Sequence, residues 1–141
     1  MDGNDYVSDD RARALLTMSL TAYALNVPLQ KVLAGRRDAR AALARQAAMY
    51  VSHVAFGISM ARVAGAFGRD RSTVGHACRL MEDRRDDTRF DRWMDALERA
   101  AEAAPKPFAI AHASKALLEA MQADPMRAAF KQFARDQGRR A

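Results

Sequence analysis

The strongest constraint on the fold is a set of glycines that bound two short amphipathic segments. Gly57 and Ser59 precede MARVAGAF, and Gly68 and Asp70 precede RSTVGHACRLM. Glycine commonly ends a helix, while Ser and Asp commonly cap the start of one. The pattern predicts a helix over 60–67, a tight turn, and a second helix over about 71–83. Apolar residues at i, i+3, i+4 and i+7 predict the inner face of the second helix: Val74, Ala77, Cys78 and Met81.

The rest of the chain also carries helical signals. Alanine is abundant and β-branched residues are sparse, which favours helix throughout. Further helices are predicted from Ser8 onward, from Pro28 to Gly35, over 41–56, and from Asp87 or Thr88 onward. The predicted inner faces are Leu15, Leu16, Leu20, Tyr23 and Ala24 in the first of these, Ala44, Ala47, Ala48, Val51, Val54 and Ala55 over 41–56, and Phe90, Trp93, Met94 and Leu97 in the last.

We therefore predict an all-α protein in three parts. Residues 1–10 carry four Asp and no base, and are expected to form a flexible acidic N-terminus. Residues 11–100 form the helical domain. Residues 101–141 comprise a linker, APKPF at 104–108, whose prolines prevent a long helix, and a C-terminal helical hairpin over 107–137. The hairpin either adds to the core of the domain or presents Met126, Phe130 and Phe133 to a partner.

Positive charge is concentrated in the predicted domain. The chain has a net charge of +6, and residues 11–100 carry 16 Lys/Arg against 9 Asp/Glu. All but one of these bases are arginine, the exception being Lys31. Arginine suits bidentate contacts with phosphate and guanine, so nucleic acid is the first anionic partner to consider and an acidic membrane surface the second. Coding bias in a GC-rich genome would produce the same arginine excess, so composition leaves both explanations open.

Several classes of protein have no support in the sequence. Cys78 is the single cysteine, so no disulfide forms within the chain, and the three histidines lack metal-ligand spacing. The acidic N-terminus differs from a signal peptide, and no apolar run is long enough to span a bilayer. No Ser/His/Asp or Cys/His set occurs in a sequence context typical of catalysis, so neither an enzyme nor a bound cofactor is predicted. His53 is interpreted as a solvated surface residue, Trp93 as core, and EDRRDDTRFDR at 82–92 as a solvated turn and helix start.

The two glycine-bounded helices have the layout of a helix-turn-helix, in which the second helix enters the DNA major groove. This layout explains the crowding of polar residues at 69–73. Arg69 and Arg71 can reach phosphate or guanine, and Asp70 can cap the helix and accept from a cytosine amine. Ser72 can donate to phosphate, and the methyl group of Thr73 can contact a thymine methyl.

The stretch VAGAFGRDRSTVGHACRLM at 63–81 resembles the signature of the C-terminal DNA-binding domain (domain IV) of the bacterial replication initiator DnaA, roughly I-G-x-x-F-G-G-R-D-H-T-T-V-x-H-A-C-R. Upstream, AYALNVPLQKVLAGRR at 22–37 and ARQAAMY at 44–50 are similar to that family's helix, basic loop and Arg-Gln helix start. The resemblance covers about residues 11–100. It implies a helix-turn-helix domain of the DnaA C-terminal, Trp-repressor-like type.

The resemblance also implies a set of DNA-contacting residues. The family binds a short asymmetric box in double-stranded DNA with one copy of the domain, and its basic-loop arginine, which falls on Arg37, enters the minor groove. The other implied contacts fall on Arg45, Arg69, Asp70, Arg71, Ser72, Thr73 and His76.

The sequence departs from the family pattern at four places. Arg71 replaces the usual His, which adds a permanent charge, and one glycine of the pair before Arg69 is missing, which would re-aim the turn. Gly75 lies inside the recognition helix, where it either lets DNA approach closely or only weakens the helix. Ala61 stands where the family often has Pro.

The sequence contains no G-x-x-x-x-G-K-[ST] motif, so it is not expected to bind ATP as the initiator does. The resemblance therefore implies a stand-alone, DnaA-related (HdaB-like) regulator in the cytoplasm, associated with the nucleoid. In one hypothesis it recognises DnaA-box-like sites and regulates chromosome replication initiation. In the alternative it mimics part of DnaA and modulates the initiator or a factor that promotes its ATP hydrolysis, with DNA binding secondary. A membrane partner is not expected.

Overall fold

The computed structural model describes residues 3–35 and 38–105, together with the isolated positions 115, 116, 119, 132, 135, 136 and 138. The chain divides into two compact units, Met1–Ala104 and Pro105–Ala141. The boundary falls in the APKPF segment. The hairpin predicted over 107–137, with Met126, Phe130 and Phe133, lies outside the described ranges.

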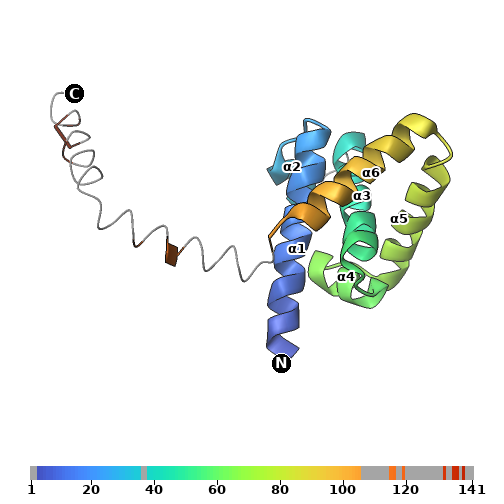
Figure 1. Cartoon of the computed structure of the whole chain (residues 1–141), viewed down its shortest axis with the longest axis horizontal. Coiled ribbons are helices and arrows are strands. Elements are labelled where there is room, and N and C mark those ends of the chain that lie inside the picture. The colour runs from blue at the N-terminus through green and yellow to red at the C-terminus, as the bar shows by residue number, and fades with distance from the viewer. Residues whose placement is uncertain are drawn as a thin grey trace. The chain divides into compact units, whose positions relative to one another are not determined.

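Six helices make up the described part of the first unit (Figure 1). They are α1 (Gly3–Ala24), α2 (Leu29–Leu33), α3 (Ala39–Phe56), α4 (Met60–Phe67), α5 (Arg71–Arg84) and α6 (Thr88–Ala103). Within the described residues every regular element is a helix, which confirms the all-α prediction. The predicted helix over 60–67 matches α4 residue for residue, and α5 extends one residue beyond the predicted end.

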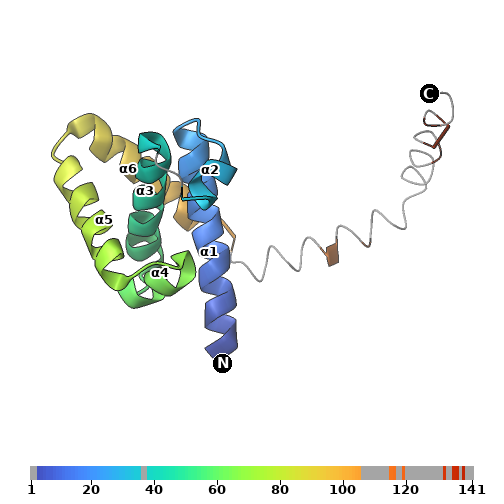
Figure 2. The same ribbon diagram turned by 180° about the vertical axis from the view of Figure 1, so that it is seen from behind.

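The central helix of the unit is α3, which packs against α1 on one side and α5 on the other (Figures 1 and 2). Its predicted inner residues Ala44, Ala47, Ala48 and Val51 are buried. Val54, also predicted to face inward, is exposed, because it lies in the last turn of α3 beside an open depression lined by His53 and Met60. Small residues let the neighbouring helices approach α3 closely, and the largest fully buried side chains, Met81 and Met94, come from α5 and α6.

The predicted inner face of α1 is correct only in part, because Leu20 packs against the core whereas Leu15, Tyr23 and Ala24 are exposed. Tyr23 is 89% exposed, whereas Thr17 and Thr21 are fully buried. The Thr17 hydroxyl donates to the carbonyl of Ala14 at 3.0 Å and shares a 2.9 Å hydrogen bond with the hydroxyl of Ser52 on α3. The Thr21 hydroxyl donates to the carbonyl of Ala44 at 3.0 Å. Because these hydroxyl groups find partners on α3, they are buried at low cost and take the place that the apolar pattern assigned to larger side chains.

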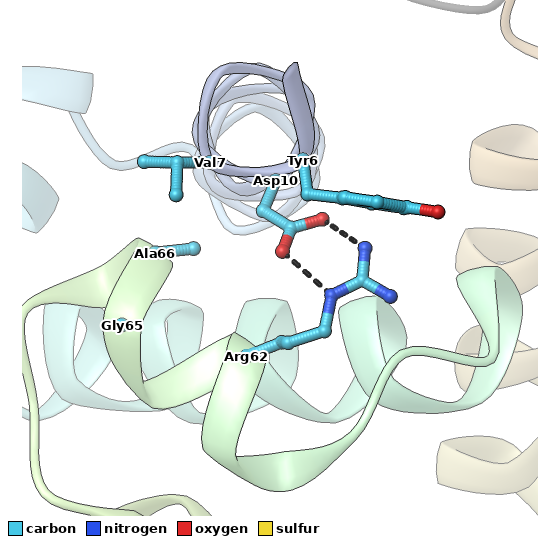
Figure 3. Close-up of a pocket in the computed structure, with 6 residues that line it drawn as sticks. All are labelled: Tyr6, Val7, Asp10, Arg62, Gly65 and Ala66. Atoms are coloured by element: carbon cyan, nitrogen blue, oxygen red, sulfur yellow. Dashed lines mark hydrogen bonds and ion pairs between the residues drawn. The ribbon is translucent and has the colours of Figure 1, made fainter. Parts of the chain in front are cut away.

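The N-terminal segment, expected to be flexible over residues 1–10, is helical from Gly3 onward. Its anchor is Asp10, whose carboxylate is buried against α4 (Figure 3). Arg62 donates to it twice, from Nε at 2.9 Å and from Nη2 at 2.7 Å. The Tyr6 ring lies against the same guanidinium, with 5.0 Å between Cζ and the ring centroid. This bidentate pair ties the start of α1 to the first helix of the predicted helix-turn-helix.

The turn and helix start predicted at 82–92 are present, and residues 82–84 and 86–89 are exposed. Arg85 in this turn also forms a network of hydrogen bonds that the sequence analysis did not predict. Arg85 donates from Nε to Asp91 at 2.6 Å, from Nη1 to Glu98 at 2.6 Å, and from Nη2 to Asp95. It also donates to the hydroxyl of Tyr50 at 3.2 Å. Burial opposes the charged form of Arg85, but hydrogen bonds with Asp91, Tyr50 and Glu98 raise its pKa on balance. The network therefore fixes the connection between α5 and α6 through a charge that is always present.

Asp38 begins α3 as an N-cap that the sequence analysis did not identify. Its carboxylate accepts from the backbone N–H groups of Arg40 at 2.9 Å and Ala41 at 3.2 Å, and Lys31 Nζ lies 3.8 Å away. The hydrogen bonds from Ala41 and Arg40 lower the pKa of Asp38 below its ordinary value, and Lys31 adds to this. This cap sets where the chain leaves the loop at 34–38 and enters α3.

The Asp38 cap predicts a pH-dependent contribution to stability. Since the folded-state pKa is lowered, the contribution is fully present above the unfolded-state pKa of about 4 and is lost as the pH falls through the folded-state value. We expect Asp38→Ala to have a lower Tm than the wild type at pH 7, and the difference to shrink as Asp38 becomes protonated. Thermal melts followed by circular dichroism from pH 7 to below pH 3 measure this. A difference in Tm that is constant over that range would contradict the assignment.

Candidate nucleic-acid interface

The turn between α4 and α5 is built from local sequence signals. The Ser59 hydroxyl accepts from the backbone N–H of Arg62 at 3.2 Å and caps α4, as predicted. Gly68 ends α4 in the left-handed conformation, with φ of 63°. The N–H of Arg69 then donates to the carbonyl of Ala64 at 3.0 Å, which is the reversal expected of a Schellman motif. A single glycine is therefore enough to reverse the chain before α5.

The predicted DNA-contacting residues of α5 face solvent, while the opposite face of the helix is buried. Val74, Ala77, Cys78 and Met81 are buried, as the spacing predicted. The exposed residues are Arg69, Asp70, Arg71, Ser72, Thr73 and His76. Burial of one face fixes the rotation of α5, so the polar residues of its first turn are presented together.

Asp70 differs from its predicted role. It occupies the N-cap position of α5 with an extended backbone, φ −73° and ψ 150°, but its side chain makes no capping hydrogen bond. Its carboxylate is exposed, and the first-turn N–H groups of α5 have no side-chain acceptor from this position. Such groups, together with the positive end of the helix, favour a phosphate oxygen.

Arg45 lies close to both α2 and this turn. Arg45, half-buried on α3, donates from Nη1 to the carbonyl of Val32 at 3.2 Å. Burial lowers the pKa of Arg45, and the nearby charge of Arg69 lowers it further. Two guanidinium groups in this arrangement favour an anion between or beside them. Arg37, the predicted minor-groove residue, lies outside the described residues.

Gly35 allows the end of α2 to lie close to Arg69 in the turn between α4 and α5. Its φ of 66° lies in the left-handed region, and a Cβ atom placed on it would lie 3.0 Å from Nη2 of Arg69. A larger residue would therefore be strained in its backbone and would also displace the guanidinium. The sequence analysis assigned Gly35 only the end of a short helix. Its contact with Arg69 depends on two segments far apart in the chain and carries no sequence signal.

Three further residues were weighed for chemical roles. His53 is not a solvated surface residue as predicted, since its Nδ1 lies 2.7 Å from the carbonyl oxygen of Ile58 and joins the end of α3 to the next turn. Cys78 is buried, and burial raises the pKa of its thiol, which fits the predicted small core residue. Trp93 is half-buried and packs against Phe90, with 5.4 Å between ring centroids. In the described part of the chain, no helix is both long and apolar enough to cross a membrane.

The fold and the exposed residues together define a class of protein. Two helices joined by a glycine turn, the second buried on one face and presenting polar and basic residues at its N-terminus, form a helix-turn-helix.

Comparison with known proteins gives one family match and one similar structure. Residues 17–80 match the family described as the bacterial dnaA protein helix-turn-helix. The structure is similar to a crystal structure of a DNA replication initiation factor, with a TM-score of 0.60 and 28% sequence identity. The match covers 67% of this chain but 30% of that protein, so the chain corresponds to less than a third of the initiation factor. A search of curated proteins gave no significant match.

Gly75, which departs from the family signature, leads to a stability prediction. A Cβ atom placed on it would meet only the Sδ atom of Met60, at 3.9 Å, which is an ordinary van der Waals contact. Since nothing obstructs an alanine there, we expect Gly75→Ala to raise the free energy of unfolding by about 1 kcal/mol. Urea titration measures the change. A loss of stability would show that the interior of α5 needs the glycine backbone.

Proposed function

We propose that this protein binds double-stranded DNA at DnaA-box-like sites and thereby regulates the initiation of chromosome replication. The observation that carries the proposal is the exposed first turn of α5, with Arg71, Ser72 and Thr73 beside the basic pair Arg45 and Arg69. A helix presented in this way can place its N-terminal residues against base edges while neighbouring cations bind phosphate. The match of residues 17–80 to the DnaA helix-turn-helix family supports DNA binding in the context of replication initiation.

The proposed contacts divide into two kinds. Arg71 and Thr73 are proposed to read bases in the major groove, with Arg71 bidentate to guanine, and Ser72 is proposed to donate to a phosphate. Asp70 is proposed to accept from a cytosine amine. The contacts proposed for the sugar-phosphate backbone come from Arg45, Arg69 and His76, and Arg37 is proposed to enter the adjacent minor groove. These assignments come from the family motif and from the exposure of the residues.

Regulation of initiation is the proposed role. The chain matches 30% of the similar initiation factor, in the part that holds the helix-turn-helix. A protein that binds the same boxes would compete or cooperate with the initiator at the origin or at promoters. We place it in the cytoplasm, associated with the nucleoid.

A binding titration tests the proposal. Fluorescence anisotropy with two duplexes of equal length, one containing a DnaA box and one with the box scrambled, gives the specificity ratio. We expect tighter binding to the box duplex, and a steep decrease of affinity with salt, with a log–log slope of about 0.9 per phosphate contacted. Equal and weak binding to both duplexes would show that sequence-specific recognition is wrong. Chromatin mapping of the tagged protein then shows whether its sites coincide with those of the initiator.

A further inference from the structure

We infer that Arg79 is an additional DNA-binding residue, which contacts a backbone phosphate at the rim of the major groove. The inference rests on the proposed function, because it requires the first turn of α5 to meet base edges. Arg79 is not among the contact positions carried over from the family motif. It is assigned here from its place on α5 and from its charge surroundings.

The position of Arg79 along α5 sets which part of DNA it can reach. Arg71, Gly75 and Arg79 follow each other at intervals of four residues, so they lie along one side of the helix. Together with Ser72 and Met60 they line a shallow depression on the surface. Eight residues of α-helix rise about 12 Å, whereas the major groove is about 8.5 Å deep. When Arg71 meets the base edges, Arg79 is therefore too far back to read bases and lies at the level of the phosphates.

The charges around Arg79 leave it available for such a contact. Its side chain is exposed, and no residue in the described ranges forms an ion pair or hydrogen bond with it. The next two basic residues along the chain, Arg84 and Arg85, contact other groups. Arg84 lies over the Phe90 ring, 5.9 Å from its centroid, and Arg85 is held by three carboxylates.

Acidic residues mark where the basic surface ends. Glu82 and Asp83, one turn beyond Arg79, are both exposed, and Glu82 accepts from the Tyr50 hydroxyl at 2.7 Å. Carboxylates at this point would repel a phosphate placed farther along α5. Arg79 is thus the last cation on this side of the recognition helix that can meet the DNA backbone.

Gly75 has no side chain, so no side chain projects from this side of α5 between Arg71 and Arg79. Apart from Met60 Sδ, nothing lies within 4 Å of a Cβ placed there. No side chain at position 75 therefore separates the duplex from the helix between Arg71 and Arg79. This matters for Arg79, because its reach to a phosphate depends on how closely α5 settles into the groove.

Salt-dependent binding of variants tests the inference. Arg79→Ala is compared with Arg79→Lys and with Arg99→Ala, which removes an exposed arginine of α6 that has no partner in the described ranges. We expect Arg79→Ala to weaken binding to box and scrambled duplexes by the same factor, about tenfold, and to reduce the log–log salt slope by about 1. Lysine should restore most of the affinity and the slope, because a phosphate needs only a point charge. Arg99→Ala should leave both unchanged.

The outcomes separate this inference from the proposed function. If wild-type protein prefers the box but Arg79→Ala, folded by circular dichroism, keeps its affinity and salt slope, Arg79 does not bind DNA and the inference is wrong. A loss confined to the box duplex would overturn the backbone assignment in favour of base reading. If the wild type shows no preference for the box, sequence-specific recognition is wrong, while equal losses on both duplexes still support the phosphate contact. Wild-type protein that binds neither duplex would overturn both.

Discussion

Replacing Arg71 with alanine is expected to weaken binding to a DnaA-box duplex by about 10- to 100-fold and to abolish most of the preference for the box over a scrambled duplex. The physical reason is the position of Arg71 in the exposed first turn of α5, where a guanidinium can form two hydrogen bonds with one guanine. Anisotropy titrations with both duplexes measure the change. The expected signature is a specificity ratio that falls much more than the affinity for the scrambled duplex.

Two further variants make the test of Arg71 sharper. Arg99→Ala removes the same charge from α6 and should leave the specificity ratio unchanged. Arg71→His restores the residue usual in the DnaA signature, and we expect it to keep specificity but to bind with a smaller salt slope at pH 8, where imidazole is neutral. Equal losses of affinity on both duplexes in Arg71→Ala would instead assign Arg71 to the backbone.

Replacing Arg85 with alanine is expected to lower the free energy of unfolding by about 2–3 kcal/mol. Asp91, Asp95 and Glu98 all converge on its guanidinium, and without it they would repel one another. The Asp91 and Asp95 side chains are 41% and 43% exposed, so water partly compensates and the loss stays below that of a fully buried network. Urea unfolding followed by circular dichroism measures the change.

Control variants distinguish the network from a simple loss of surface charge. Arg92→Ala removes an exposed arginine of α6 and should change the free energy of unfolding by less than about 0.5 kcal/mol. Arg85→Lys keeps the charge but cannot bridge three carboxylates and Tyr50 at once, so we expect an intermediate loss. Destabilisation of Arg85→Ala no larger than that of Arg92→Ala would show that the network contributes nothing to stability.

Much of the recognition helix could be predicted because its signals are local. The Ser59 cap, the Gly68 stop and the spacing of Val74, Ala77 and Cys78 each act within one or two turns of their own helix. The family signature added the identities of the exposed polar residues. Asp70 shows the limit of such signals, since its backbone takes the cap conformation while its side chain does not complete the hydrogen bond.

Where the sequence analysis erred, the deciding partner lies far along the chain. Thr17 is buried because its hydroxyl forms a hydrogen bond with Ser52 on α3. The carboxylate of Asp10 is buried because Arg62 on α4 donates to it. Hydrophobic periodicity assigns a polar residue to the surface, and only a partner on another helix reverses that assignment. His53 is a similar case, held by a carbonyl beyond the end of its helix.

The sequence by itself determined that α2 to α6 are helices, where α4 and α5 begin and end, and which residues the first turn of α5 presents, because capping and side-chain periodicity act over a few residues. Only the tertiary structure decided which face of α1 is buried and that Gly35 lies against Arg69 beside Arg45. It also decided that Arg85 has several partners whereas Arg79 has none among the residues that the structure describes. Those features depend on which side chains meet across helices, and pairing at long range leaves no pattern in a single chain.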